Sequence, residues 1–352
     1  MTAGKDPVLP AKLAAHPSVR AVLARRRTTT GPPPVLDAAW LRELCLAAGA
    51  DDVAAVSLDH PDLAGEREYV LGALPGTRSL VAMAFRMNRD NCRSPARSVA
   101  NQEFHQTDEQ ANHAARAVVQ ALQDAGHHAI NPSVGFPQEM DRFGTDRIWV
   151  VAHKTVAVAA GLGVMGLHRN VIHPKFGSFV LLATVLVDAE VSEYGQELDY
   201  NPCIDCKLCV SACPVGAIGK DGAFDGLACT THNYREFMSG FTDWAQTVAG
   251  SADAADYRTR VTDAENASLW QSLSSPPGYK SGYCLAVCPA GEDVLAPYLE
   301  DRKAFLDTVL RPLREKRETL YVMPGSRAAE YVRSRFPHKP VKEVTGGWRP
   351  PG

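Results

Sequence analysis

The chain has 352 residues, of which 45% are hydrophobic and 22% charged, and its formal net charge is −3 at pH 7. These values are typical of a globular protein with one large and one smaller domain, and they exclude a strongly basic protein that binds polyanions through its overall charge. The longest apolar run, residues 178–187, has the length of a strand and is too short to span a membrane.

Residues 1–35 are basic and proline-rich and end in a Gly-Pro-Pro-Pro turn, which predicts a flexible arm outside the core. Asp37 then stands at the N-cap of an amphipathic helix that extends to about Ala48. Residues 53–58 have the pattern of a strand, and the apolar run 80–85 is typical of a strand buried on both faces.

A long helix is expected over residues 107–125, and a second buried strand over residues 180–188. Helices and strands that alternate at this spacing predict an α/β or α+β domain over residues 36–195.

In residues 153–179 a short apolar helix is followed by three closely spaced glycines, Gly161, Gly163 and Gly166. Glycines grouped in this way let the main chain approach a bulky group closely, which is either another part of the protein or a ligand. The spacing matches G-x-G-x-x-G, but the glycines follow a helix-like run instead of a strand, and no acidic residue stands about twenty positions on. A dinucleotide site is therefore not expected.

Four cysteines, Cys203, Cys206, Cys209 and Cys213, follow the spacing C-x2-C-x2-C-x3-C, with Pro214 directly after them. In such a run three thiolates on a tight loop hold one iron–sulfur cluster, and the fourth points to a second cluster. Zinc favours two C-x2-C pairs set well apart, and disulfides between cysteines this close would be strained. The run therefore predicts iron–sulfur clusters in a reducing compartment, and we expect the cytoplasm.

A second C-x3-C-P element at Cys284 and Cys288 repeats the end of the first run, and Cys229 lies between the two. The repeat predicts a swap in which each element supplies one ligand to the other cluster. Cluster one then takes Cys203, Cys206, Cys209 and Cys288. Cluster two takes Cys213, Cys229 and Cys284.

Cluster one is expected to be a [4Fe-4S] cluster. Cluster two has three thiols, so it is either a [4Fe-4S] cluster completed by Ser281, His232 or solvent, or a [3Fe-4S] cluster without a fourth ligand. Cys45 and Cys92 lie far from these runs and are expected to be buried thiols without a ligand role.

Residues 196–300 are predicted to form this two-cluster, ferredoxin-like domain. Residues 301–352 carry twelve Lys and Arg against six Asp and Glu, which predicts a basic, helical C-terminal extension. A single amphipathic helix is expected over residues 294–316, a last strand over 319–323 and a last helix over 328–336.

Together, the segments AGLGVMG and PKFGSFVLLATVLVD, the cysteine array after them, and PGTRSLVAMAF at residues 75–85 resemble the epoxyqueuosine reductases, relatives of the corrinoid-dependent reductive dehalogenases. The resemblance covers residues 36–295. It implies a nitroreductase-like domain that holds cobalamin beside a ferredoxin-like domain that supplies electrons, with ferredoxin or flavodoxin as the electron donor. Gly161, Gly163 and Gly166, with Lys154 and Arg169, would then contact the cofactor.

The chain also departs from that family. Arg147 stands where the resemblance places a catalytic Asp, and Ser281 stands where a cluster Cys is expected. The helical repeats that help epoxyqueuosine reductases grip tRNA have no counterpart here. We therefore expect a sister group that reduces a small organic substrate; a nucleic acid is the less favoured partner, and the basic tail leaves it open.

A proton donor must lie within hydrogen-bond reach of the substrate and have a pKa near the working pH. His153 is the first candidate, because imidazole titrates in that range. Asp146, Asp141 and His105 follow, and the alternative for His153 is a core histidine bonded to the main chain. Two other functions remain open: a corrinoid-free electron-transfer protein that serves a partner enzyme, and a reductase that binds flavin.

Overall fold

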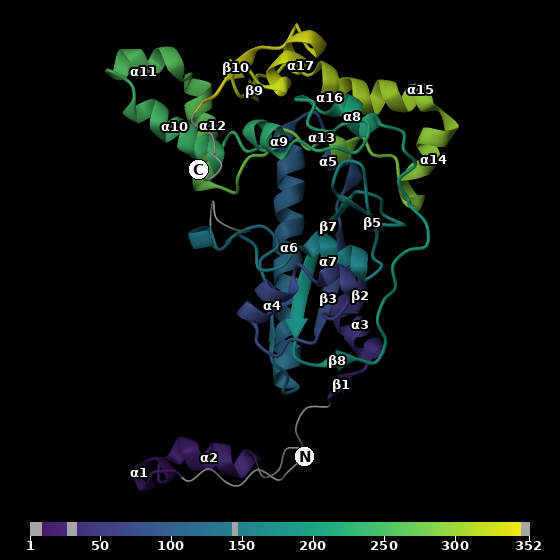
Figure 1. Cartoon of the computed structure of the whole chain (residues 1–352), viewed down its shortest axis with the longest axis vertical. Coiled ribbons are helices and arrows are strands. Elements are labelled where there is room, and N and C mark those ends of the chain that lie inside the picture. Colours follow the sequence, from purple (N-terminus) through teal and green to yellow (C-terminus); the bar gives the residue numbers. More distant parts are fainter. Residues whose placement is uncertain (1–8, 27–33, 143–146, 346–352) are drawn as a thin grey trace.

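The computed structural model describes residues 9–26, 34–142 and 147–345 (Figure 1). The predicted N-terminal arm contains two helices, α1 (Ala11–Ala14) and α2 (Pro17–Arg26). After them come a domain built on a β-sheet and then the cysteine-rich part, residues 201–344, which we call the cluster module. None of the helices in the described ranges combines the length and the apolar character that a membrane crossing requires.

The first domain is organised around a four-stranded sheet in the order β2-β3-β7-β4, in which all neighbours are antiparallel. The strands are β2 (Asp52–Ser57), β3 (Ser79–Arg86), β7 (Val180–Val187) and β4 (Ala129–Ile130). Almost every residue of β3 and β7 is buried, as their continuous apolar sequences predicted. The mixed helix and strand fold class is thus confirmed, and the antiparallel sheet makes it α+β.

Helices cover both faces of this sheet. One face packs against α3 (Ala38–Ala47) and α6 (Arg97–Asp124), and the other against α4 (Arg67–Ala73) and α7 (His153–Ala159). Asp37 accepts a hydrogen bond from the main-chain N–H of Trp40, so the predicted N-cap of α3 is confirmed.

Helix α6 begins ten residues before the start that the sequence predicted, and its first three turns face the cluster module instead of the sheet. There Asn101 Nδ2 donates to the carbonyl of Tyr279 at 3.2 Å, and His105 Nε2 lies 2.8 Å from the carbonyl oxygen of Pro277. The apolar stripe that marks the sheet-facing part is therefore absent from this part of the helix. In Figure 1, α6 runs from the cluster module to the far end of the first domain.

Shorter elements connect these parts. β1 (Val35–Leu36) pairs in parallel with β8 (Glu190–Val191), and β5 (Val164–Met165) pairs antiparallel with β6 (Val171–Ile172). The remaining short helices of this domain are η1 (Pro61–Leu63), α5 (Arg89–Arg93) and η2 (Met140–Arg142).

The cluster module begins with three short helices that carry cysteines, α8 (Leu208–Ala212), α9 (Gly226–Asn233) and α13 (Tyr283–Ala286). Between α9 and α13 the chain forms a further helical group, α10 (Ser239–Ala249), α11 (Ala254–Arg260) and α12 (Asp263–Ser274).

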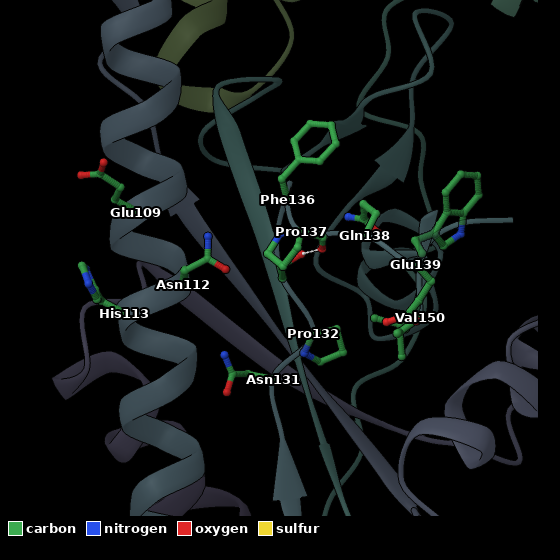
Figure 2. Close-up of a pocket in the computed structure, with 13 residues that line it drawn as sticks. Glu109, Asn112, His113, Asn131, Pro132, Phe136, Pro137, Gln138, Glu139 and Val150 are labelled. Carbon is green, nitrogen blue, oxygen red and sulfur yellow. Dashed lines mark hydrogen bonds between the residues drawn. The ribbon is translucent and has the colours of Figure 1, made fainter. Parts of the chain in front are cut away.

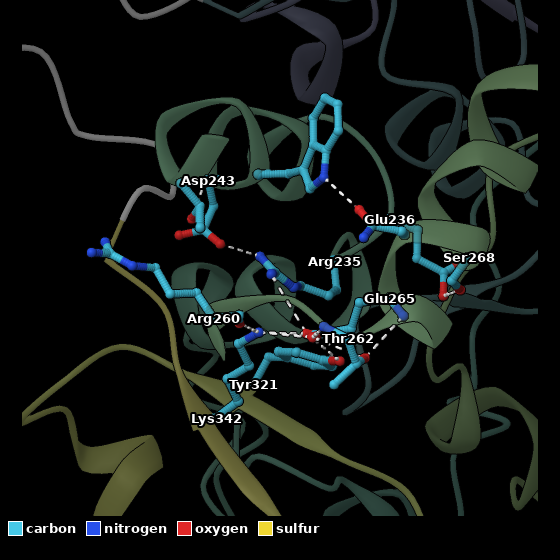
Figure 3. Close-up of polar contacts among 12 residues, drawn as sticks. Arg235, Glu236, Asp243, Arg260, Thr262, Glu265, Ser268, Tyr321 and Lys342 are labelled. Atoms are coloured by element: carbon cyan, nitrogen blue, oxygen red, sulfur yellow. Dashed lines mark hydrogen bonds and ion pairs between the residues drawn. The ribbon is translucent and has the colours of Figure 1, made fainter. Parts of the chain in front are cut away.

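A polar network anchors this helical group to the C-terminal segment (Figure 3). Lys342 Nζ donates to Glu265 Oε1 at 2.7 Å, and Tyr321 Oη donates to the same carboxylate oxygen at 3.3 Å. Arg235, buried beside them, forms an ion pair with Asp243. Because these charges are paired and largely buried, the network fixes how the helical group attaches to the module.

The C-terminal segment is part of the same module. It comprises α14 (Glu292–Glu300), α15 (Arg302–Phe305), a π-helical turn (Leu306–Leu310), α16 (Arg311–Glu315), β9 (Leu320–Val322), α17 (Arg327–Arg335) and β10 (Val341–Glu343). The single helix expected over 294–316 is wrong, because Asp301 adopts an extended conformation and caps the new helix α15. Residues of strand β9 and helix α17 share one hydrophobic core with Cys209 and Cys213.

Candidate metal centre

The loop that carries the first three cysteines folds back on itself at two residues. Asp205 has φ of 50° and Lys207 has φ of 59°, left-handed conformations that few non-glycine residues adopt. The two reversals lie between successive cysteines, so they wrap the chain around one centre. Cys203, Cys206 and Cys209 consequently line the same small cavity.

Helices α8 and α13 pack side by side through Leu208, Ala212 and Ala286. Cys209 and Cys213 are four residues apart on and just after α8, which corresponds to about 6 Å of helix axis. Cys284 and Cys288 have the same spacing on and after α13. Each helix therefore presents two thiols about one turn apart. At this spacing one thiol can bind one metal centre while the other binds a neighbouring centre.

One set of thiols contains Cys203, Cys206, Cys209 and Cys288, which share the cavity mentioned above. Burial raises the pKa of Cys209 to about 12, with further contributions from the thiols of Cys288 and Cys206. Burial likewise raises the pKa of Cys288 to about 12. Thiols crowded together in this way favour a cation that neutralises several thiolates at once.

A second set contains Cys213, Cys229 and Cys284. Burial raises the pKa of Cys229 to about 11, and the neighbouring Cys213 adds to the rise. Burial also raises the pKa of Cys284, with contributions from Cys213, Cys229 and then Cys209. The electrostatic contribution of Cys209 to the pKa of Cys284 indicates that the two sets of thiols are neighbours.

Main-chain donors point at these sulfurs. The N–H of Ala217 donates to Cys213 Sγ at 3.2 Å, and further main-chain N–H groups of residues 215–218 favour its thiolate. Cys288 receives support from the N–H of Ala290 and from the Ser178 hydroxyl. Hydrogen bonds of this kind stabilise sulfur ligands in iron–sulfur proteins, so the donor set fits a cluster.

The spacing of the sulfurs also bears on the metal. In the described part of the chain, no three cysteine sulfurs all lie within 4.8 Å of one another. A tetrahedral zinc site with Zn–S bonds of about 2.3 Å brings its sulfurs to about 3.8 Å. In the described residues the thiols are therefore not gathered as tightly as a bound zinc ion would hold them.

Cys288 reaches the first loop because its own loop docks on the first domain by main-chain contact. The N–H groups of Glu292 and Asp293 donate to the carbonyls of Pro174 and Lys175 at 2.9 and 3.0 Å. Gly177 and Gly291 face each other here, and a Cβ on Gly177 would lie 2.0 Å from the carbonyl oxygen of Ala290. Only glycine fits at such a close crossing.

Two side chains were considered as a fourth ligand of cluster two. The Ser281 hydroxyl donates to Asn233 Oδ1 at 3.0 Å. His232 accepts the N–H of Tyr321 at Nδ1 (3.3 Å), so a neutral imidazole carries its proton on Nε2 and has no lone pair there for a metal. The Ser281 hydroxyl is bonded to Asn233, and the ring lone pair of His232 is used by the Tyr321 N–H while its buried Nε2–H has no partner in the described residues. A cluster held by this second set would therefore have three protein thiols.

The three glycines after α7 approach the chain itself. A Cβ on Gly161 would lie 2.0 Å from the carbonyl oxygen of Gln196, and one on Gly163 would lie 2.5 Å from that of Ile172. A Cβ on Gly166 would meet side-chain atoms of Ile172 at 2.7 Å. Of the two readings of this stretch, the packed turn accounts for the glycines, and the turn brings residues 166–170 against the cluster module.

His153 and Lys154 begin α7 and point to different partners. His153 Nδ1 lies 2.9 Å from Thr184 Oγ1 and Nε2 lies 3.0 Å from the carbonyl oxygen of Ser133, while burial lowers its pKa. Lys154 Nζ donates to the Arg169 carbonyl and to Asn170 Oδ1, both at 2.9 Å.

The Lys154 ammonium also lies close enough to Cys284 and Cys229 to interact with them electrostatically, although burial lowers its pKa. Arg169 has φ of 63° and contributes its carbonyl to this contact. Of the two cations that the resemblance assigned to a cofactor, Lys154 therefore lies near the second set of thiols, and Arg169 holds it there through its carbonyl.

The other acid–base candidates are dispersed. His105 lies at the contact between α6 and the cluster module, and Asp141 is exposed in η2. Asp146 lies outside the described residues. Arg147, at the position of the expected catalytic acid, pairs with Glu66 and stacks on the ring of Tyr69 at 3.6 Å.

A cavity of about 550 Å³ lies between α6 and residues 131–151, and we call it pocket 1 (Figure 2). Asn112 and Gln138 provide amide groups in its wall, and Phe136 and Trp149 are aromatic side chains that remain 42% and 43% exposed. No pattern in the sequence predicted this site, because its residues come from segments without a motif.

Pocket 1 is connected to the second set of thiols by aromatic rings. Phe136 packs edge-on against Phe237 with ring centres 6.3 Å apart, and Phe237 lies 4.7 Å from Tyr234. Burial raises the pKa of Tyr234, and Cys229 adds to the rise, so this ring lies near that thiol.

Comparison with known proteins identifies the cysteine run. Residues 197–219 match the family model described as a 4Fe-4S binding domain. The chain is also similar to curated epoxyqueuosine reductases. That of Cellulophaga algicola is 33% identical over 27% of this chain and 33% of its own length, and that of Leadbetterella byssophila is 36% identical over 25% and 26%. The chain thus matches at most a third of the length of these relatives.

Solved structures of epoxyqueuosine reductases and of a reductive dehalogenase align with a larger share of this chain, at lower sequence identity. The epoxyqueuosine reductase of Streptococcus thermophilus aligns with a TM-score of 0.39 and 16% identity, over 78% of each chain. An epoxyqueuosine reductase solved with a modified tRNA stem loop gives a TM-score of 0.40 and 17% identity, over 88% of this chain and 76% of that one. A catabolic reductive dehalogenase gives 0.46 and 15%, over 78% and 34%.

Proposed function

We propose that this epoxyqueuosine reductase-like chain is an oxidoreductase in which two iron–sulfur clusters supply electrons to a small organic substrate in pocket 1. When bound, each cluster takes up and releases one electron. Cys203, Cys206, Cys209 and Cys288 hold cluster one. Cys213, Cys229 and Cys284 hold cluster two.

The observation that carries this proposal is the gathering of seven thiols from separate segments into two adjacent sets, one of them beside α7. Cys284 packs against the core that contains Cys209 of the other set, and Cys209 contributes to the raised pKa of Cys284, so the two sets are neighbours. Tyr234 and Phe237 then lead from Cys229 to the wall of pocket 1. A redox site needs such proximity, because electron transfer between separate centres requires short distances.

Pocket 1 has the size of a typical small-molecule site, since such pockets measure about 300–1,000 Å³. Phe136 and Trp149 offer ring faces for a flat organic molecule. The Asn112 amide lines the same wall, where its Nδ2 donates to the Asp108 carbonyl at 2.8 Å and its Oδ1 accepts the Val134 N–H at 3.1 Å. Glu109 and His113 stand one turn apart on α6 and are the titratable groups of that wall. We propose Glu109 and His113, in place of His153, as the groups that deliver protons to a substrate in pocket 1.

A corrinoid is the acceptor that the family resemblance implies, and the residues assigned to it do not fit one. The space beside Gly161 and Gly163 is filled by the main chain of Gln196 and Ile172, and the Lys154 ammonium already has two protein acceptors. No step of the proposal therefore passes through a corrinoid. Incubation with hydroxocobalamin should leave the protein without a corrinoid spectrum after gel filtration; stoichiometric retention would contradict this.

A corrinoid-free electron-transfer protein is the second candidate, and the same packing of the glycines favours it. The two candidate functions differ in the role of pocket 1. The oxidoreductase binds its substrate there, whereas an electron carrier needs no such pocket. Electron donors such as ferredoxin or flavodoxin suit either function, and tRNA, the ligand of one structural relative, is the alternative substrate to test in parallel.

The deciding experiment starts from protein isolated without oxygen. Iron and sulfide analysis should give eight sulfides per chain together with seven or eight irons, where seven irons correspond to one [4Fe-4S] and one [3Fe-4S] cluster. The oxidised protein should show a three-iron paramagnetic resonance signal if cluster two has only three ligands. Absence of iron and sulfide would overturn the proposal.

The reduced protein should then be mixed with a panel of flat organic oxidants, with cluster absorbance recorded over time. Asn112→Leu and Trp149→Ala should slow reoxidation by at least tenfold for the class of compound that pocket 1 accepts, with iron content unchanged. Equal rates in all variants would favour the electron-transfer function. A yellow chromophore released on denaturation would instead point to flavin.

A further inference from the structure

Residues 166–170, the loop after the glycine turn, are the part of the first domain that lies against both sets of thiols. Leu167 packs on the core that includes Cys209 and Cys213. Leu167 and His168 also line the cavity shared by the four thiols of cluster one. On the other side of the loop, Asn170 holds the Lys154 ammonium near cluster two.

His168 is a buried side chain, with 3% of its surface exposed. Its Nδ1 accepts the main-chain N–H of Asn170 at 3.1 Å, so the proton of the neutral imidazole is on Nε2. Nε2 is fully buried and has no hydrogen-bond partner in the described ranges of the chain. A buried donor without an acceptor is costly, which indicates that its acceptor is a group that occupies the cavity.

We propose that the His168 Nε2–H group donates a hydrogen bond to a sulfur atom of cluster one and thereby raises its reduction potential. Reduction adds negative charge to the sulfurs, so a donor aimed at them stabilises the reduced state more than the oxidised state. His168 has no lone pair at Nε2, so it is a positioning residue and not a ligand. The inference rests on the proposed function, because it requires that cluster one is bound.

The test compares wild-type protein with His168→Leu and His168→Gln, all prepared without oxygen with their clusters intact. Reductive titration followed by paramagnetic resonance measures the midpoint potential of cluster one. His168→Leu should lower the equilibrium constant for reduction about tenfold, which is 59 mV for a one-electron couple. His168→Gln keeps an N–H donor and should recover at least part of the shift.

His127→Leu is a matched control. His127 is also a buried histidine, 5% exposed, with an unpartnered Nε2, but it lies beyond the far end of α6 from the cluster module. Its substitution should leave the potential of cluster one unchanged.

A second readout uses protein labelled with 15N-histidine. Pulsed paramagnetic resonance of reduced wild-type protein should show a weak nitrogen coupling to cluster one that His168→Gln removes. An unchanged potential in His168→Leu, or no nitrogen coupling in the wild type, would overturn the inference. Loss of cluster one from both variants would also overturn it, because that result identifies a ligand. Wild-type protein without iron would instead refute the proposed function itself.

Discussion

His232 shows at the scale of one residue how packing ties the stability of the cluster module to pH. Burial lowers its pKa to about 3, and Lys280, Lys339 and Lys316 add to the shift. In the unfolded chain a histidine has a pKa of about 6.5. Between these two values the unfolded state binds a proton that the folded state excludes, so the contribution of His232 to stability is complete above pH 6.5 and falls as the pH falls toward 3.

The variant His232→Asn removes this titration and can still accept the N–H of Tyr321. We compare the free energy of unfolding of the wild type minus that of the variant at two pH values. This difference should be about 1.4 kcal/mol lower at pH 5.5 than at pH 7.5. Denaturant titrations under anaerobic conditions measure both values, with the exposed His128→Asn as control. A constant difference between wild type and variant would show that His232 does not titrate in this way.

At the scale of elements, the crossing of the 174–178 loop with the loop after Cys288 decides whether the fourth ligand reaches cluster one. Gly177 has φ of 67° and no space for a Cβ, whereas Gly325 has φ of 64° and no atom within 4 Å of the position of a Cβ. Gly325→Ala should therefore cost only the backbone strain of about 1–2 kcal/mol. Gly177→Ala should cost the same backbone strain and should also displace the loop after Cys288.

We expect Gly177→Ala to lower the melting temperature further than Gly325→Ala and to reduce the iron bound per chain, which Gly325→Ala should leave unchanged. Calorimetry and iron analysis on the two variants give the comparison. Equal iron content and equal melting temperatures would mean that the loop shifts without disturbing cluster one.

At the scale of the whole molecule, the two parts differ in what stabilises them. The first domain has two large apolar cores on the faces of its sheet, whereas the cluster module gathers its cysteines in smaller cores around buried thiols. Metal binding therefore contributes directly to the folding of the module, while the sheet domain has enough apolar contact of its own.

Removal of iron by a chelator under reducing conditions should make the cluster module, residues 201–344, sensitive to protease and leave a fragment close to residues 36–191. Mass spectrometry of the digestion products, with and without iron, locates the cuts. Cleavage of the sheet domain first, or the same pattern in both states, would contradict this division of stability.

The sequence by itself determined the features that depend on a few neighbouring residues. The cysteine spacing indicated iron–sulfur chemistry, the continuous apolar runs indicated β3 and β7, and Asp37 indicated the start of α3. In each case the signal is local, because a cap, a strand or a metal-binding loop is formed by residues within a few positions of one another.

The tertiary structure decided everything that depends on which segments meet. It placed Cys288 beside the first loop through a crossing of two glycines, and it assigned the protons of His168 and His232 through single main-chain donors. It also formed pocket 1 from segments without a motif. Such contacts join residues far apart in the chain, and they are set by how whole elements pack, which no short pattern encodes.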